Sequence, residues 1–167
     1  CSSSVFATSS NSALLLNTDI FVGGTAPNCT LSMTPLPNRN GSTTITLIVD
    51  DGFLTASDTF VLTVTAVNDP PTIEDVPNLT TSEDTPINSI SVKINDVDGP
   101  LNCTSALSKS SSNTTLIPVS NIIFGGSYPN CTVSITPAPD KNGTSTITLT
   151  VSDGEGGSAS DSFLLTV

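Results

Sequence analysis

Residues 142–154 read Asn142-Gly143-Thr144-Ser145-Thr146-Ile147-Thr148-Leu149-Thr150-Val151-Ser152-Asp153-Gly154. Between the Asn-Gly and Asp-Gly pairs, apolar residues alternate with Ser and Thr, which is the period-two pattern of a half-buried strand. A second alternating run follows at residues 160–167. Because Asp153-Gly154 lies between the two runs, it predicts the turn of a β-hairpin.

The same landmarks occur about 102 residues earlier in the chain. Asn130-Cys131-Thr132 has its counterpart in Asn28-Cys29-Thr30, residues 139–143 in residues 37–41, and Asp153-Gly154 in Asp51-Gly52. A repeat of this length is too long for a solenoid unit and has the size of a domain. We therefore expect a partial repeat at residues 1–66, a linker at 67–71 and a complete repeat at 72–167.

The complete repeat contains short strand-like segments separated by Gly, Pro, Asn and Asp. We expect strands at residues 72–76, 87–94, 102–107, 116–119, 122–124, 131–136, 145–151 and 160–167. This spacing predicts an all-β fold of tandem immunoglobulin-like sandwiches.

The first repeat is expected to lack its first strands. Cys1 aligns with Cys103, so nothing precedes it that corresponds to residues 66–102. A sandwich without these strands has open sheet edges. Two explanations stay open: the sequence is a window from a longer array, or a neighbouring molecule supplies the missing strands.

The charge and composition exclude several classes of function. The net charge is −11, with four basic residues and no His. Nucleic acid is excluded as a partner because phosphate binding needs clustered Lys and Arg. Without His there is no Ser-His or Cys-His dyad, and we expect no enzymatic activity. No run of about 20 apolar residues predicts a membrane span.

The four cysteines occupy equal positions in the two repeats. Four cysteines allow three connectivities, and the equal separations favour Cys1–Cys29 and Cys103–Cys131. Disulfides indicate an oxidising compartment, so we expect an extracellular or cell-surface location. Free thiols are the alternative; a zinc site is improbable because the chain has neither His nor a Cys-x-x-Cys motif.

The sequence is rich in acceptor motifs for N-linked glycans, in which Asn precedes any residue and then Ser or Thr. We expect glycans on some of these sites: Asn28, Asn40, Asn78, Asn102, Asn113, Asn130 and Asn142. The alternative for Asn40 and Asn142 is turn chemistry, because Asn-Gly suits a positive φ before a strand.

Four motifs in order carry a family resemblance. They are Val67-Asn68-Asp69-Pro70-Pro71-Thr72-Ile73, Ser82-Glu83-Asp84-Thr85-Pro86-Ile87, Asn95-Asp96-Val97-Asp98-Gly99 and residues 142–154. Together they resemble the tandem cadherin-like and bacterial immunoglobulin-like repeats of large surface proteins. The resemblance implies a β-sandwich, tandem stacking, an extracellular location and a structural or adhesive role.

The resemblance also implies calcium at the joints between repeats. Hard cations need six to eight oxygen ligands. The candidate ligands are Asn68 and Asp69 in the linker, Glu83 and Asp84 after the first strand, Asp96 and Asp98 after the next, and Asp51 in the last hairpin of the first repeat. Asp-rich turns without a metal are the alternative.

The sequence thus favours an extracellular repeat module with a mechanical or adhesive role, either a stalk or the subunit of a filament. Its expected partners are copies of itself or further repeats of the same chain. A glycan- or ligand-binding module is an alternative, although the chain offers only Tyr128 and six Phe as aromatic platforms. A spacer of a larger secreted enzyme is another.

Overall fold

The computed structural model describes residue 1 and residues 4–167. The chain forms two compact units, Cys1–Val67 (unit 1) and Asn68–Val167 (unit 2). Residues 68–71, which the sequence predicts as linker, group with unit 2 because Asn68 and Asp69 bond to its loops.

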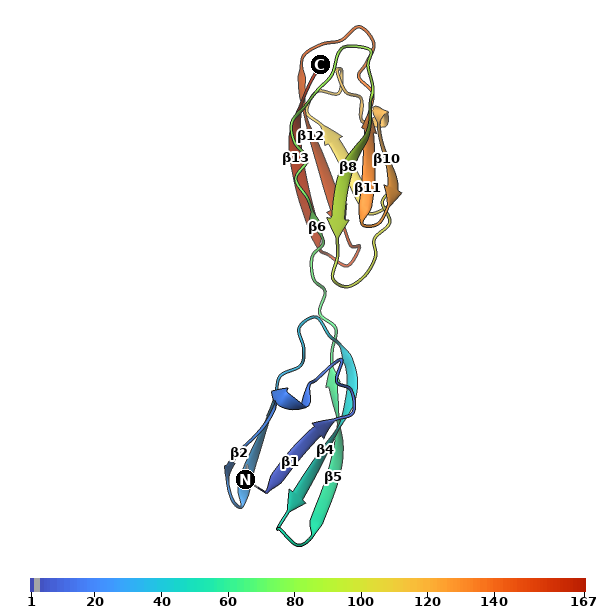
Figure 1. Ribbon diagram of the computed structural model, residues 1–167. Helices are drawn as coiled ribbons and strands as arrows, with labels where there is room; N and C mark the ends of the chain where they lie inside the picture. Colours follow the sequence, from blue (N-terminus) through green and yellow to red (C-terminus); the bar gives the residue numbers. More distant parts are fainter. Residues whose placement is uncertain (2–3) are drawn as a thin grey trace. The chain divides into compact units, whose positions relative to one another are not determined.

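Unit 2 is a sandwich of two four-stranded sheets (Figure 1). The first sheet has the order β10 (Ile122–Ser127), β11 (Asn130–Ile135), β8 (Ile87–Asn95), β6 (Thr72–Ile73). The second has the order β7 (Leu79–Thr80), β13 (Ser158–Thr166), β12 (Thr144–Ser152), β9 (Leu107–Ser111). Neighbouring strands are antiparallel, except that β7 runs parallel to β13. This confirms the predicted all-β, immunoglobulin-like sandwich.

The core of unit 2 lies between the two sheets and follows from the alternation of the strands. In β12, Ile147, Leu149 and Val151 are fully buried, while the Thr residues between them face outward. Phe163 of β13 is 1 % exposed and packs in the same cluster as Val92 and Ile94 of β8. Both sheets are therefore needed to enclose this core.

Two predicted strands of unit 2 are turns in the structure. At residues 102–107, the side-chain oxygen of Asn102 accepts hydrogen bonds from the amides of Thr104 and Ser105, and strand β9 begins only at Leu107. At residues 116–119, the Leu116 amide donates to the side-chain oxygen and the backbone carbonyl of Asn113, and the Ile117 amide donates to the same carbonyl. Both predictions are wrong because an Asn side chain offers the backbone a local turn instead of a ladder. A 3₁₀ turn, η2 (Val119–Asn121), follows.

Unit 1 repeats part of this plan. Its strands are β1 (Val5–Ser9), β2 (Ile20–Thr25), β3 (Asn28–Met33), β4 (Gly41–Asp50) and β5 (Thr55–Val64), with the 3₁₀ turn η1 (Asn17–Asp19) before β2. β1, β4 and β5 form one sheet, and β2 pairs with β3. In order they correspond to β9, β10, β11, β12 and β13. In the part of unit 1 that the structure describes, no strand corresponds to β6, β7 or β8.

The missing strands change the burial of equivalent residues. Phe60 of β5 is 38 % exposed, whereas its counterpart Phe163 is 1 % exposed. Val49 of β4 is 49 % exposed, whereas Val151 is fully buried. Unit 1 therefore has the strand pattern of a sandwich without its enclosed core.

Replacing Phe60 and Phe163 by Ala, one at a time, tests the difference in burial between the two units. We expect Phe163→Ala to destabilise unit 2 by about 3–5 kcal/mol, because it leaves a cavity in a closed core. Phe60→Ala serves as the matched control and should cost several-fold less. Amide hydrogen exchange under native conditions resolves the two units separately. Equal losses in both units would contradict the difference in burial.

Candidate functional site

Five polar residues gather at one end of unit 2, which we call the linker end: Asn68, Asp69, Asp96, Asp98 and Asp153. Asn68 donates from Nδ2 to Oδ2 of Asp153 over 2.9 Å, and the Asp69 amide donates to Oδ2 of Asp98 over 2.7 Å. These bonds fasten the segment before β6 to two loops, one after β8 and one between β12 and β13.

The loop after β8 is itself held by side chains. The Asp98 amide donates to Oδ1 of Asp96 over 2.9 Å, and Asp96 is only 8 % exposed. The hydroxyl of Tyr128 lies 3.2 Å from the Asp96 amide and can also donate to Oδ1 of Asn95. The loop is therefore held by hydrogen bonds to its own carboxylate and to Tyr128.

Asp153 accepts hydrogen bonds both from the linker and from its own hairpin turn. Its pKa is lowered, first by the hydrogen bond from Asn68 and then by the amides of Glu155 and Gly157. Those two amides donate to Oδ1 over 2.7 and 3.0 Å. All three donors favour the ionised carboxylate, so the charge of Asp153 couples the linker to the hairpin turn.

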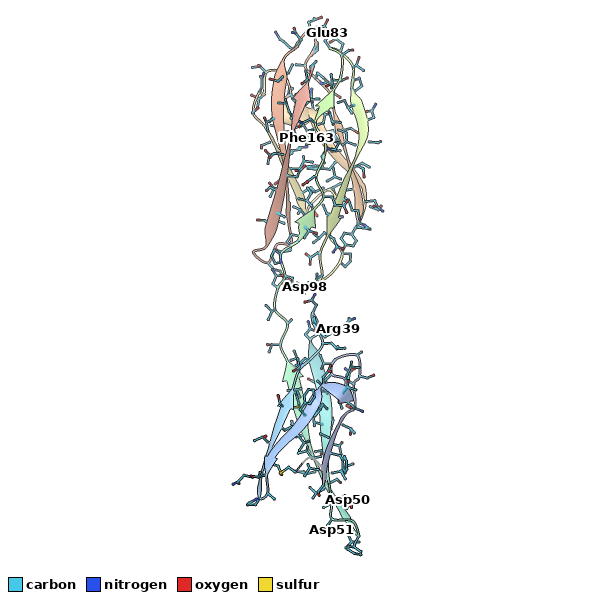
Figure 2. All side chains as sticks on the ribbon, turned by 60° about the vertical axis from the view of Figure 1, so that its left-hand side comes forward. Arg39, Asp50, Asp51, Glu83, Asp98 and Phe163 are labelled. Atoms are coloured by element: carbon cyan, nitrogen blue, oxygen red, sulfur yellow. A yellow bond between two sulfur atoms is a disulfide. The ribbon has the colours of Figure 1, made fainter. Side chains whose placement is uncertain are left out.

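The structure does not bring Glu83 and Asp84 to the linker end. Figure 2 shows Glu83 at one end of unit 2 and Asp98 at the other, with Phe163 between them. Asp84 instead accepts a hydrogen bond from the Asp140 amide over 3.0 Å. The grouping of these two residues with Asp96 and Asp98 is wrong because β8 runs the length of the sandwich between the two loops.

Asp51 also lies away from its predicted position. It lies in the turn between β4 and β5 (Figure 2), whereas the linker follows the other end of β5 (Thr55–Val64), a strand of ten residues. At about 3.3 Å per residue, the two ends of β5 are roughly 30 Å apart. Asp51 corresponds to Asp153, and the amides of Leu54 and Phe53 lower its pKa.

The acidic residues of the linker end do not form a preassembled cluster of metal ligands. Asp96, Asp98, Asp153 and Glu155 line a pocket of about 150 Å³. Nevertheless, within residues 4–167 and Cys1, no three Asp, Glu, His or Cys side chains are close enough together to hold a metal. The oxygens of Asp98 and Asp153 accept hydrogen bonds from Asp69 and Asn68. Calcium therefore stays a prediction.

The sequence analysis missed Asp153 and assigned its role to Asp51. The repeated Asp-Gly pair could have identified Asp153. In this sandwich the strands run from one end to the other, and the turn of the last hairpin lies at the end where the first strand begins. The correct assignment follows when each hairpin is matched to the linker before its own unit rather than the one after it.

The cysteines are joined in the pairing favoured by the sequence. Cys1 is bonded to Cys29 with 5.7 Å between their Cα atoms, and Cys103 to Cys131 with 5.4 Å. The second disulfide lies in the core of unit 2, where its cysteines are 4 % and 0 % exposed. Cys29, by contrast, is exposed.

The glycan acceptor motifs lie on the surface, with one exception. Asn28, Asn40, Asn78, Asn102, Asn130 and Asn142 are exposed, whereas Asn113 is half-buried. The Asn78 side-chain oxygen accepts a bond from the Leu164 amide over 2.8 Å, which leaves its amide nitrogen as the atom for glycan attachment. Asn113 uses its amide nitrogen to donate to the Thr144 carbonyl over 3.4 Å.

Residues 68–166, more than half of the chain, match the sequence model of a family described as bacterial Ig domain. The chain belongs to this family. The match starts at the residue that opens unit 2 and covers nearly all of that unit.

Solved structures of similar fold share little sequence with this bacterial Ig chain. Domains 4 and 5 of the S-layer protein SbsC are 13 % identical, with a TM-score of 0.44, over 99 % of this chain and 72 % of that one. Titin domains Z1Z2 in complex with telethonin are 15 % identical, with a TM-score of 0.48, over 98 % and 80 %. An endo-fucoidan hydrolase of glycoside hydrolase family 107 is 17 % identical, with a TM-score of 0.40, over 98 % of this chain and 23 % of the enzyme.

The comparison with curated proteins gives no match. Among the described residues, no helix has the length and apolar character needed to cross a bilayer.

The bond between Asn68 and Asp153 can be tested through acid stability. Because folding lowers the pKa of Asp153, its stabilisation is complete well above the unfolded value of about 3.9 and is lost as pH falls through the folded value. We expect Asn68→Ala to raise the Asp153 pKa toward its usual value and to weaken the acid resistance of unit 2. Carboxyl-carbon NMR titration measures both Asp residues at once, with Asp51 as the internal control. A shift of both, or of neither, would contradict the assignment.

Proposed function

We propose that the chain is an extracellular structural and adhesive repeat module of a surface protein, and the subunit of a glycosylated filament whose neighbours share strands. The observation that carries the proposal is that the two units repeat one plan: they share five strand positions and an equivalently placed disulfide. A plan repeated along one chain is the architecture of a module that works in series, and strand sharing between neighbours is the way in which we propose that such units join into a filament.

Membership of the bacterial Ig family supports a repeat module that works in series. Family membership and the repeat both concern the architecture of the chain. The acidic residues of the linker end hold the linker and the turns, and the absence of His leaves no ordinary general base near neutral pH. A structural role needs no such group.

The disulfides support an extracellular location. Each closes a loop between residues 28 positions apart, which on the chain-entropy model stabilises a unit by about 3–4 kcal/mol. This gain matters for domains with few aromatic side chains, and it requires an oxidising compartment.

Exposed acceptor motifs support glycosylation. Asn28 and Asn130 begin the repeat-equivalent strands β3 and β11, and both side chains are exposed. Glycans there would extend from the same place on each unit and hinder lateral aggregation. Asn113 should carry the least glycan, since attachment would disrupt its bond to Thr144.

A glycan-binding function has less support. The single Tyr of the chain, Tyr128, is half-buried, and its hydroxyl bonds to Asn95 and Asp96. Phe163 is in the core, so neither ring of unit 2 named here is free to stack on a sugar. The exposed rings are Phe residues of unit 1: Phe6, Phe21, Phe53 and Phe60.

Electron microscopy of the native material tests the proposal. We expect regular fibres with an axial repeat of one or two domains, and an intact mass above the 17.0 kDa of the bare chain. Peptide mapping after deglycosylation should show exposed sites occupied and Asn113 least occupied. Isolated rods would contradict the filament, and the bare mass would contradict the glycans.

A further inference from the structure

The first sheet of unit 2 ends in β10, whose outer edge no described strand pairs with. The Thr136 amide donates to the Asn121 carbonyl, so this pair is hydrogen-bonded across β10 and β11. Because antiparallel pairs alternate between bonded and non-bonded, Ile122 and Phe124 hold non-bonded positions, and their carbonyls point away from β11. An edge with free backbone groups is a template for another strand.

β10 is an apolar edge strand without a charge of its own. Residues 110–139 contain no Asp, Glu, Lys or Arg. Within β10, Ile123 is 56 % exposed on the outer face, and Phe124 is half-buried. An uncharged segment rich in apolar residues at a sheet edge promotes pairing between chains, so this edge needs protection.

Lys109 brings a positive charge to this edge from the second sheet. It holds a half-buried, inward-facing position of the edge strand β9. Its ammonium group donates to the Ile122 carbonyl, and Nζ lies 5.2 Å from the centre of the Phe124 ring. The other basic residues of the chain are exposed: Arg39, Lys93 and Lys141. Lys109 is therefore the basic side chain that reaches the open groups of β10.

We propose that Lys109 prevents β10 from pairing with β10 of a second copy of this chain. The pair would be antiparallel and two-fold symmetric, and it would need the Ile122 carbonyl that Lys109 already occupies. It would also place two Lys109 ammonium groups along one short ladder and remove water from them, which is costly for an unpaired charge. An inward-pointing charge is one of the means by which natural sheets protect an edge.

Neutral replacements of Lys109 test this proposal in the full chain, freed of any glycans. Lys109→Met keeps the apolar stem, and Lys109→Gln keeps a donor for the Ile122 carbonyl. We expect both variants to dimerise at concentrations at least tenfold lower than the original chain, measured by sedimentation velocity. Amide exchange at Phe124 should slow in the dimers, because that amide faces the open edge. Neutral variants that dimerise no more readily would overturn the proposal, as would dimers in which Phe124 exchanges as before.

Three further variants separate the position of the charge from its mere presence. Lys93→Met removes an exposed charge that lies 2.7 Å from Glu74 and should leave the dimerisation concentration within about twofold of the original. Lys109→Arg keeps the charge and should do the same. Added to Lys109→Met, Ile123→Lys returns a charge to β10 and should restore the monomer. Equal dimerisation of the Lys93 and Lys109 variants would overturn the proposal, as would dimers that persist with Ile123→Lys.

The proposal goes beyond the proposed filament and does not depend on strand sharing. It concerns association through β10, whereas the filament concerns how successive units join. Isolated rods in native material would reject the filament and leave the expected behaviour of the Lys109 variants unchanged.

Discussion

Pairing between β8 and β11 brings the two halves of the unit 2 core together. In unit 2 this pairing places Val92 and Ile94 against Phe163 and buries the disulfide. Unit 1 has strands equivalent to five of those in unit 2 and, among its described residues, none equivalent to β6, β7 or β8, and its Phe60 and Val49 stay in contact with solvent. Because burial of apolar surface is the main favourable term in folding, β8 and the two short strands beside it separate a closed sandwich from two half-covered sheets.

Short polar side chains fix what the ladders leave undetermined. The side chains of Asn102 and Asn113 each begin a turn by accepting hydrogen bonds from backbone amides. Ser145, which is 1 % exposed, accepts a hydrogen bond from the Asn113 amide over 3.1 Å. At the linker end, the hydrogen bond between the side chains of Asn68 and Asp153 holds the linker where no backbone ladder does. At these places, the fold therefore depends on hydrogen bonds from short polar side chains.

The sequence predicts the ladders of this fold better than its turns. The alternating run at residues 144–152 and the Asp-Gly turn after it have one interpretation, because their period and their breakers agree. Residues 102–107 and 116–119 contain enough apolar residues to be predicted as strands. The hydrogen bonds of Asn102 and Asn113 show that these residues form turns. Those bonds depend on three-dimensional geometry. β7, two residues long, carries too little pattern to be recognised.

For the candidate site, the sequence predicts composition better than position. Asp96 and Asp98 lie two residues apart in one loop, so their proximity follows from the chain itself. Glu83 and Asp51 also carry carboxyl groups, but each lies at the opposite end of its unit from the place predicted for it, because a strand of nine or ten residues lies between. Without the strand order, an acidic residue cannot be assigned to one end of a sandwich.

The parallel pairing of β7 with β13 sets how unit 2 would respond to tension. A pull on Asn68 and on Val167 acts at opposite ends of the sandwich. It drives β7 toward one end and β13 toward the other, so the two strands slide along each other. Bonds such as those at Leu165–Leu79 and Thr166–Thr80 are then loaded together and not one after another. Cys103 and Cys131 lie 28 positions apart and cannot separate even after these strands part, so the residues between them add no length. The unit would resist force along its strands and, once opened, would lengthen by less than its residue count suggests.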